Sequence, residues 1–194
     1  MTASIYKSPA GEARILELYD RFEKCLNIDF GDRMVNTRFG ATHVLVTGPE
    51  QGLPVVIKFY QPAGDAGSPT PAAARALSIF APDTIGDPGK SAQIRLSPRD
   101  QSYGLWLNDV LDGLGLDSAA FIGGSFGAGI MLSPSHRRLQ QAVQWMGSGS
   151  SDGILELVEA VFKHVRVEAE MPRPATKVEL SGFTSPTMVI SAFF

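Results

Sequence analysis

The sequence predicts an α/β fold in which a mostly parallel sheet carries helices on both faces and begins with an antiparallel hairpin. Short segments rich in β-branched and aromatic residues alternate along the chain with segments whose apolar residues recur every three or four positions. That alternation is typical of a parallel sheet covered on both sides by helices. The first two extended segments are separated by a tight turn, which indicates an antiparallel pair. A length of 194 residues suits one domain, so we expect a single domain over 1–194.

Composition excludes several classes of protein. Hydrophobic residues make up 44% of the chain and charged residues 19%, as in ordinary globular domains. With 17 Lys and Arg against 20 Asp and Glu, the net charge is −3, which argues against a nucleic-acid partner. No apolar run approaches the roughly 20 residues of a membrane helix, and residues 1–15 lack the apolar core of a signal peptide. The single cysteine, Cys25, cannot form an internal disulfide, so we expect a cytoplasmic protein without a membrane partner.

The first half of the chain contains one helix and several strands. The spacing of apolar residues predicts an amphipathic helix over 11–26. Composition and alternation predict strands over 33–38, 42–47, 53–60 and 78–81, the last closed by Pro82. Between them we expect a turn at 39–41, a loop over 61–71 and a short helical segment over 72–77.

The second half contains two more helices and two more strands. Ser97, Pro98 and Asp100 have the pattern of a helix start, with Ser97 as the cap. This helix would run to Leu114 and end at the glycines that follow. We expect strands over 119–122 and 187–194, a helix over 151–165, and no strand between 129 and 140.

The strongest chemical signal is Gly123-x-Ser125-x-Gly127, which lies between a predicted strand and a helix. A serine on a sharp strand-to-helix turn needs neighbours with almost no side chain two positions away. Ser125 would then project over the rim of the sheet as a nucleophile. The N–H group of Phe126 would point at a developing oxyanion.

Several stretches, taken in order, resemble the α/β-hydrolase family and its carboxylesterase-like bacterial members. Arg38–Leu45 looks like the opening hairpin, Ala81–Ser91 like the loop after the fourth strand, and Phe121–Gly129 like the nucleophile elbow. The similarity extends over about 4–52 and 81–130. The resemblance implies a serine hydrolase acting on a small-molecule carboxylic ester, with Ser125 as nucleophile and Phe126 as one oxyanion donor.

The chain departs from the family pattern in three places. The third strand lacks the usual His-Gly, so the second oxyanion donor would be a backbone N–H near Gln61. Only 194 − 125 = 69 residues follow Ser125, and the acid and the histidine of the triad have no counterpart on this alignment. We therefore expect a truncated or internally deleted α/β-hydrolase, in which 134–180 would hold any remnant of a cap.

No cofactor or metal is expected from motif spacing. Gly89-Lys90-Ser91 looks like the end of a phosphate loop, but Thr84 stands where that loop needs glycine. The glycines after 122 do not form a dinucleotide fingerprint. His43, His136, His164 and Cys25 lack metal-ligand spacing. The histidines are interpreted as structural (His43) or solvated side chains, and Asp83 and Asp87 as turn formers.

Two functional hypotheses follow. The first is a serine hydrolase of carboxylic esters by resemblance. The second is a non-catalytic remnant or binding module that keeps the sheet without the triad acid and histidine. An exposed late strand could also pair between copies, so a homo-oligomer is among the expectations.

Overall fold

A computed structural model describes residues 4–25, 28–58, 76–123, 126–131, 139–144, 163–164 and 188–189. Within these residues a seven-stranded sheet has the order β1-β2-β4-β3-β5-β6-β7. The strands are β1 (Gly31–Thr37), β2 (Gly40–Thr47), β3 (Leu53–Lys58), β4 (Leu77–Pro82), β5 (Ala119–Gly123), β6 (Leu139–Gln144) and β7 (Met188–Val189). The helices of more than two described residues are α1 (Pro9–Cys25), α3 (Ser102–Leu114) and α4 (Phe126–Met131).

The sheet is mostly parallel with an antiparallel hairpin at one edge, as predicted. Strand β1 pairs antiparallel with β2, and β2 pairs antiparallel with β4. All neighbours from β4 through β3, β5 and β6 to β7 are parallel. The carboxyl ends of these parallel strands therefore meet at one edge of the sheet, where α/β proteins bind their ligands.

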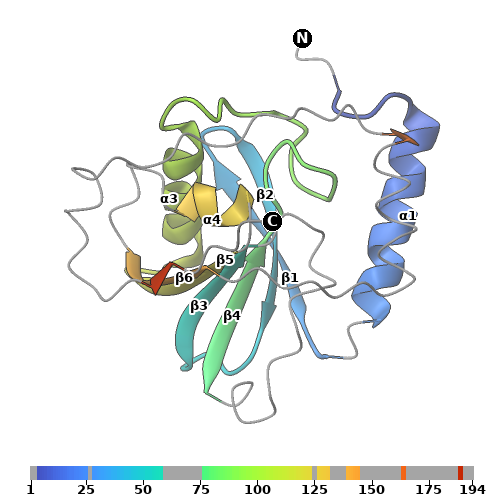
Figure 1. Cartoon of the computed structure of the whole chain (residues 1–194). Helices are drawn as coiled ribbons and strands as arrows, with labels where there is room; N and C mark the ends of the chain where they lie inside the picture. The colour runs from blue at the N-terminus through green and yellow to red at the C-terminus, as the bar shows by residue number, and fades with distance from the viewer. Residues whose placement is uncertain are drawn as a thin grey trace.

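Alternation along β2 places the helices on opposite faces of the sheet. Thr42 accepts a hydrogen bond at Oγ1 from Nε1 of the buried Trp106 on α3, at 2.8 Å. The next residue, His43, points the other way and meets Tyr19 of α1. Successive strand residues face opposite sides, so α1 and α3 cover the two faces. Figure 1 shows α1 on one side of the sheet and α3 with α4 on the other.

The larger core lies between the sheet and α3. Trp106, Leu107, Val110 and Leu111 of α3 are at most 1% exposed and form one cluster with apolar residues of the sheet. Phe121 of β5 is also completely buried in this cluster. A smaller cluster joins α1 to the segment before it, through Ile5, Tyr6, Ile15 and Leu18. Both helices thus bury the apolar stripe that their sequence spacing predicts.

Helix α3 begins later than the sequence predicts. Ser97 Oγ accepts a hydrogen bond from the N–H of Arg99, and Asp100 Oδ1 accepts one from the N–H of Ser102. In each of these bonds a side chain accepts from the main-chain N–H two residues later, and the local turn that results competes with helix formation. The helix therefore starts at Ser102, and its first main-chain bond runs from the Leu105 N–H to the Gln101 carbonyl. Its end is as predicted, because Gly115 adopts φ 73° there.

Other boundaries differ by smaller amounts. The turn of the hairpin lies at residues 38–39, and Gly40, with φ 128°, already begins β2. Leu77, predicted as helical, is the first residue of β4, and Pro82 is its last. The other residues of the predicted loop and helical segment over 61–77, apart from Ala76, lie outside the described part of the chain.

A strand that the sequence analysis missed lies inside the predicted cap segment. Residues Leu139–Gln144 form β6, which pairs with β5 in the sheet. The expectation of no strand after α4 is therefore wrong at 139–140, and 139–144 belong to the sheet rather than to a cap. Of the remaining residues of 134–180 only Lys163 and His164 are described, and both are helical. None of the helices among the described residues combines the length and apolar character needed to cross a bilayer.

Candidate active site at the carboxyl edge of the sheet

The end of β5 and the start of α4 frame the predicted nucleophile. Gly123 is buried and ends β5 in the middle of the sheet, and Phe126 begins α4. Only residues 124 and 125 separate the strand from the helix. Ser125 itself lies outside the described residues, so its role remains a prediction. Gly127, the second glycine of the motif, is buried in the first turn of α4.

Aromatic packing fixes the start of α4. The ring of Phe126 meets the ring of Tyr103 edge-on, with centroids 5.5 Å apart, and Tyr103 meets Trp106 in the same way at 6.4 Å. Ile130, on the next turn of α4, is completely buried in the main core. The main chain that carries the Phe126 N–H is therefore anchored to α3 through side chains on both helices.

The predicted second oxyanion donor follows the neighbouring strand. Strand β3 runs parallel to β5, with Lys58 opposite Gly123 in the register. Both strands therefore end at the same level of the sheet. Gln61 comes three residues after Lys58 and lies outside the described residues, and its part in an oxyanion hole likewise remains a prediction.

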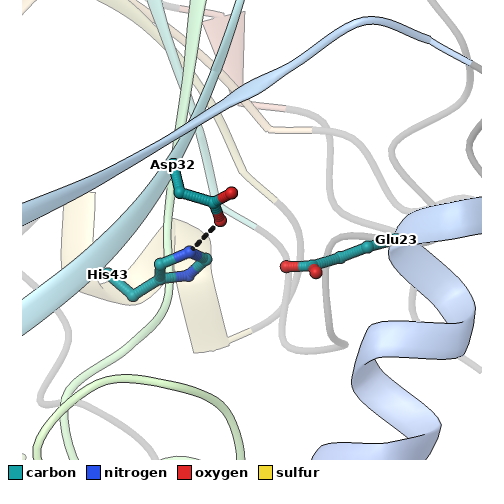
Figure 2. Close-up of side chains that lie close together, drawn as sticks. All are labelled: Glu23, Asp32 and His43. Atoms are coloured by element: carbon teal, nitrogen blue, oxygen red, sulfur yellow. Dashed lines mark hydrogen bonds and ion pairs between the residues drawn. The ribbon is translucent and has the colours of Figure 1, made fainter.

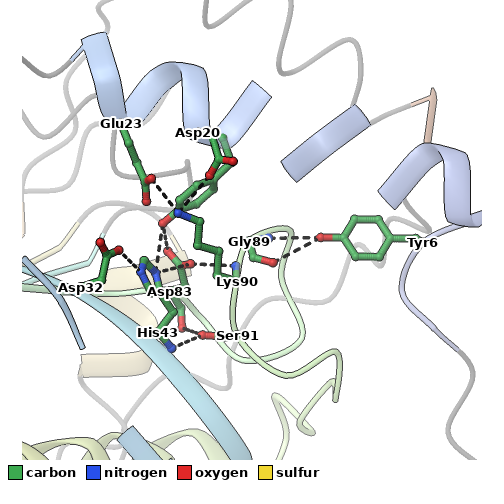
Figure 3. Close-up of polar contacts among 10 residues, drawn as sticks. Tyr6, Asp20, Glu23, Asp32, His43, Asp83, Gly89, Lys90 and Ser91 are labelled. Atoms are coloured by element: carbon green, nitrogen blue, oxygen red, sulfur yellow. Dashed lines mark hydrogen bonds and ion pairs between the residues drawn. The ribbon is translucent and has the colours of Figure 1, made fainter. Parts of the chain in front are cut away.

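A buried polar cluster occupies the same edge at the end of β4 (Figure 3). Asp83 directly follows β4 and accepts hydrogen bonds from the Tyr19 hydroxyl at 2.7 Å and from the Lys90 N–H at 3.0 Å. Its Oδ2 lies 3.1 Å from Nδ1 of His43. The predicted role of Asp83 as a turn former understates these contacts, because its side chain connects α1, β2 and the loop after β4. Asp87 does take part in a turn, since its N–H donates to the Thr84 carbonyl.

His43 is held on both ring nitrogens. Its side chain is 2% exposed, and Nε2 lies 2.6 Å from Oδ1 of Asp32. Its main-chain N–H donates to Oγ of Ser91, which in turn donates to the Asp83 carbonyl. Burial lowers the pKa of His43, but the hydrogen bond and charge of Asp83, together with the hydrogen bond of Asp32, outweigh burial and raise the pKa above its usual value. Through these two carboxylates, His43 connects β2 to β1 and to the residue that follows β4.

Lys90, the lysine of the Gly-Lys-Ser sequence, is directed at α1. Its ammonium lies 2.6 Å from Glu23 and 3.0 Å from Asp20, and 5.0 Å from the centre of the Tyr19 ring. Burial lowers the pKa of Lys90, but its bonds to the two carboxylates outweigh burial and raise the pKa above its usual value. Burial, followed by the charge of Asp83, strongly raises the pKa of the Tyr19 hydroxyl, which stays protonated as a donor. The loop therefore connects α1 to the sheet.

One group of side chains in this cluster offers atoms of the kinds that bind metal ions. Three atoms lie within 4.8 Å of one another: a carboxylate oxygen of Glu23, a carboxylate oxygen of Asp32 and a ring nitrogen of His43. Figure 2 shows the three side chains converging from α1 and from the β1–β2 hairpin. These residues come from three separate elements and form no sequence motif, so no metal ligands were expected among them.

The comparisons with known proteins agree with this architecture. No protein-family profile matches the chain. Carboxylesterase nap of Bacillus subtilis, itself uncharacterized, is 34% identical over 102 residues, which cover 48% of this chain and 32% of that protein. Carboxylesterase YbfK of the same organism is 32% identical over 117 residues, covering 59% of this chain and 39% of that protein. The crystal structure of YbfK superposes with a TM-score of 0.73 and 19% identity over 93% of this chain and 80% of that chain.

The chain has the α/β-hydrolase fold and is similar to bacterial carboxylesterases. The aligned segments span between about a third and two fifths of the two carboxylesterase sequences that it matches. The resemblance inferred from the hairpin, the loop after β4 and the elbow segment is therefore confirmed for the fold and for the similarity to bacterial carboxylesterases.

The other two histidines of this α/β-hydrolase-fold chain do not extend the site among the described residues. His164 was expected to be solvated, but it is half-buried against α1: its carbonyl accepts the Lys7 N–H at 2.9 Å, and a Cβ built on Gly11 would lie 3.0 Å from its own Cβ. Because Gly11 has no side chain, the side chain of His164 can lie against α1 at this position. His136 lies outside the described residues.

Proposed function

We propose that this chain hydrolyses carboxylic esters of small molecules, with Ser125 as the nucleophile. The observation that carries the proposal is the two-residue connection between the buried end of β5 at Gly123 and the start of α4 at Phe126. A nucleophile elbow requires such a connection, with glycines on both sides of the serine. The similarity to carboxylesterases supports the same chemistry.

The proposed reaction proceeds in two steps. Ser125 Oγ bonds to the carbonyl carbon, and the alcohol leaves with the proton that the serine gives up. Water then adds to the acyl-serine and releases the acid. The backbone N–H groups of Phe126 and of a residue near Gln61 stabilise the oxyanion in both steps. Among the described histidines, His43 is unsuited as the general base, because Asp83 and Asp32 occupy both its nitrogens.

Hydrolysis of p-nitrophenyl butyrate by the full chain tests this proposal. We expect Ser125→Ala to lower the enzymatic rate at least about 10³-fold, because the acyl-serine can no longer form. Ser97→Ala is the matched control, since Ser97 is exposed in the turn before α3, and its rate should equal that of the parent. An unchanged rate in Ser125→Ala would favour the alternative of a non-catalytic binding module.

We also propose a cytoplasmic location. The sole cysteine, Cys25, is exposed as a free thiol at the end of α1. An exposed free thiol is more compatible with a reducing compartment than with an oxidising one.

A further inference from the structure

We propose that Glu23, Asp32 and His43 form a binding site for a divalent transition-metal ion, best matched by Zn²⁺. This site is separate from the proposed Ser125 chemistry and does not depend on it. It joins the end of α1 to the β1–β2 hairpin (Figure 2). Its ligand atoms already lie within 4.8 Å of one another.

An unpartnered carboxylate oxygen points to a missing cation. Glu23 Oε1 is buried and has no hydrogen-bond partner among the described residues. The whole Glu23 side chain is only 11% exposed, and its other oxygen, Oε2, is bound by the Lys90 ammonium. Burying a carboxylate oxygen without a hydrogen-bond donor costs free energy, and a cation bound to that oxygen would remove this cost.

His43 is oriented as a metal-binding histidine. Its Nδ1 lies 3.1 Å from Asp83, which is itself held by the Tyr19 hydroxyl and the Lys90 N–H. This arrangement directs Nε2 towards Asp32 and Glu23. A carboxylate that binds the distal ring nitrogen commonly orients histidine ligands in metal sites. On binding, the ion replaces the bond between Nε2 and Asp32: any proton on Nε2 passes to solvent, and Nε2 and the Asp32 carboxylate both become ligands.

The balance of charge favours a cation. The cluster contains four carboxylates and one ammonium: Asp20 and Glu23 pair with Lys90, and Asp32 and Asp83 are bonded to His43. With His43 protonated the cluster carries 2 − 4 = −2 charges, and with neutral His43 it carries 1 − 4 = −3. A divalent ion between Glu23 and Asp32 would offset most of this excess.

The site is open to solvent, and its ligand types favour Zn²⁺ over Ca²⁺ and Mg²⁺. Asp32 is 57% exposed, so an ion and its water can reach the site from solvent. Zn²⁺ accepts one imidazole nitrogen and two carboxylates with water in the fourth position, whereas Ca²⁺ and Mg²⁺ prefer oxygen ligands alone. Zinc bonds of about 2.0–2.2 Å require ligand atoms closer together than 4.8 Å, and the exposed Asp32 side chain can rotate to close the site.

Zinc binding by the full-length, chelator-stripped chain tests the proposal. The experiment uses a Cys25→Ser background, because this exposed thiol, two residues after Glu23 in the sequence, could bind zinc itself. We expect calorimetric titration with Zn²⁺ to show one equivalent bound and the Tm to rise with zinc concentration. Co²⁺ in place of zinc should give the visible absorption of a four-coordinate nitrogen–oxygen site.

Matched variants locate the ion. Glu23→Gln and Asp32→Asn should each weaken zinc binding at least about 10-fold, because each removes a charged ligand. Glu17→Gln is the control: Glu17 is an exposed carboxylate of the same helix, paired with Arg14, and should bind zinc as the background chain does. Asp32→Asn alters an exposed side chain, so circular dichroism should show it folded. Failure of the background chain to bind Zn²⁺, or undiminished binding by either ligand variant, overturns the proposal.

Discussion

Asp83 receives hydrogen bonds from side chains and main chain that are far apart in the sequence. Its partners Tyr19 and Lys90 lie 64 residues before it and 7 residues after it. It is 9% exposed, and a buried carboxylate is tolerated only when such donors surround it. The hydrogen bond from the Tyr19 hydroxyl to Asp83 is the shortest of these contacts. Single polar atoms in this cluster therefore influence how α1 is held on the sheet.

Replacement of Tyr19 by phenylalanine should test this contribution. Tyr19→Phe removes the hydroxyl that donates to Asp83, so we expect the free energy of unfolding to fall by about 1–3 kcal/mol in urea titrations. Tyr6→Phe is a matched control, because the Tyr6 hydroxyl makes only long contacts of 3.5 and 3.3 Å with Gly89. Equal losses in the two variants would argue against a special role for the Asp83 contact. Both titrations are carried out in the presence of a chelator, so that bound metal does not contribute to the free energy of unfolding.

At the scale of elements, an ion pair fastens the hairpin to α3. Arg38 in the β1–β2 turn donates from Nε and Nη2 to the two carboxylate oxygens of Asp109, at 2.9 and 2.8 Å. Burial raises the pKa of Asp109, but the Arg38 bonds outweigh it and hold the pKa below its usual value. The folded state therefore binds a proton at Asp109 less readily than the unfolded state does. This stabilisation is present above the unfolded pKa and disappears as the pH falls through the folded pKa.

The pH dependence of Arg38→Gln follows from that sign. We expect this variant to have a lower Tm than the parent at pH 7, and the difference to shrink as the pH falls below about 4 towards 2. Arg14→Gln serves as the control, because the Arg14–Glu17 pair is exposed on α1 and should change the Tm little at either pH. A difference that stays constant across this range would show that the ion pair does not account for the loss.

Local patterns explain which elements could be predicted. The apolar spacing of α1 and the apolar composition of β3, β4 and β5 located those elements to within a few residues. Strand β6, Leu139–Gln144, contains three glutamines and has little apolar signal, so it forms through pairing with β5 and could not be recognised alone. The start of α3 was missed because the bonds of Ser97 and Asp100 to nearby main chain resemble caps in sequence.

At the scale of the whole molecule, the parallel order of β4, β3 and β5 places three strand ends side by side at one edge. The elbow motif was predictable, because its glycines and serine are neighbours in sequence. The Glu23, Asp32 and His43 group was not, because the spacings of nine and eleven residues match no motif. Only the packing of α1 across the hairpin brings their side chains together.

The proposed catalytic role of Ser125 is tested most directly by covalent capture. The full-length chain, incubated with a fluorophosphonate and digested, is examined by mass spectrometry for the residue that carries the phosphonyl group. We predict modification on the peptide that contains Ser125, absent in Ser125→Ala and unchanged in Ser97→Ala. Folded protein that takes up no phosphonyl group, or takes it up on another serine with Ser125 unmodified, would contradict the assignment of Ser125 as the nucleophile.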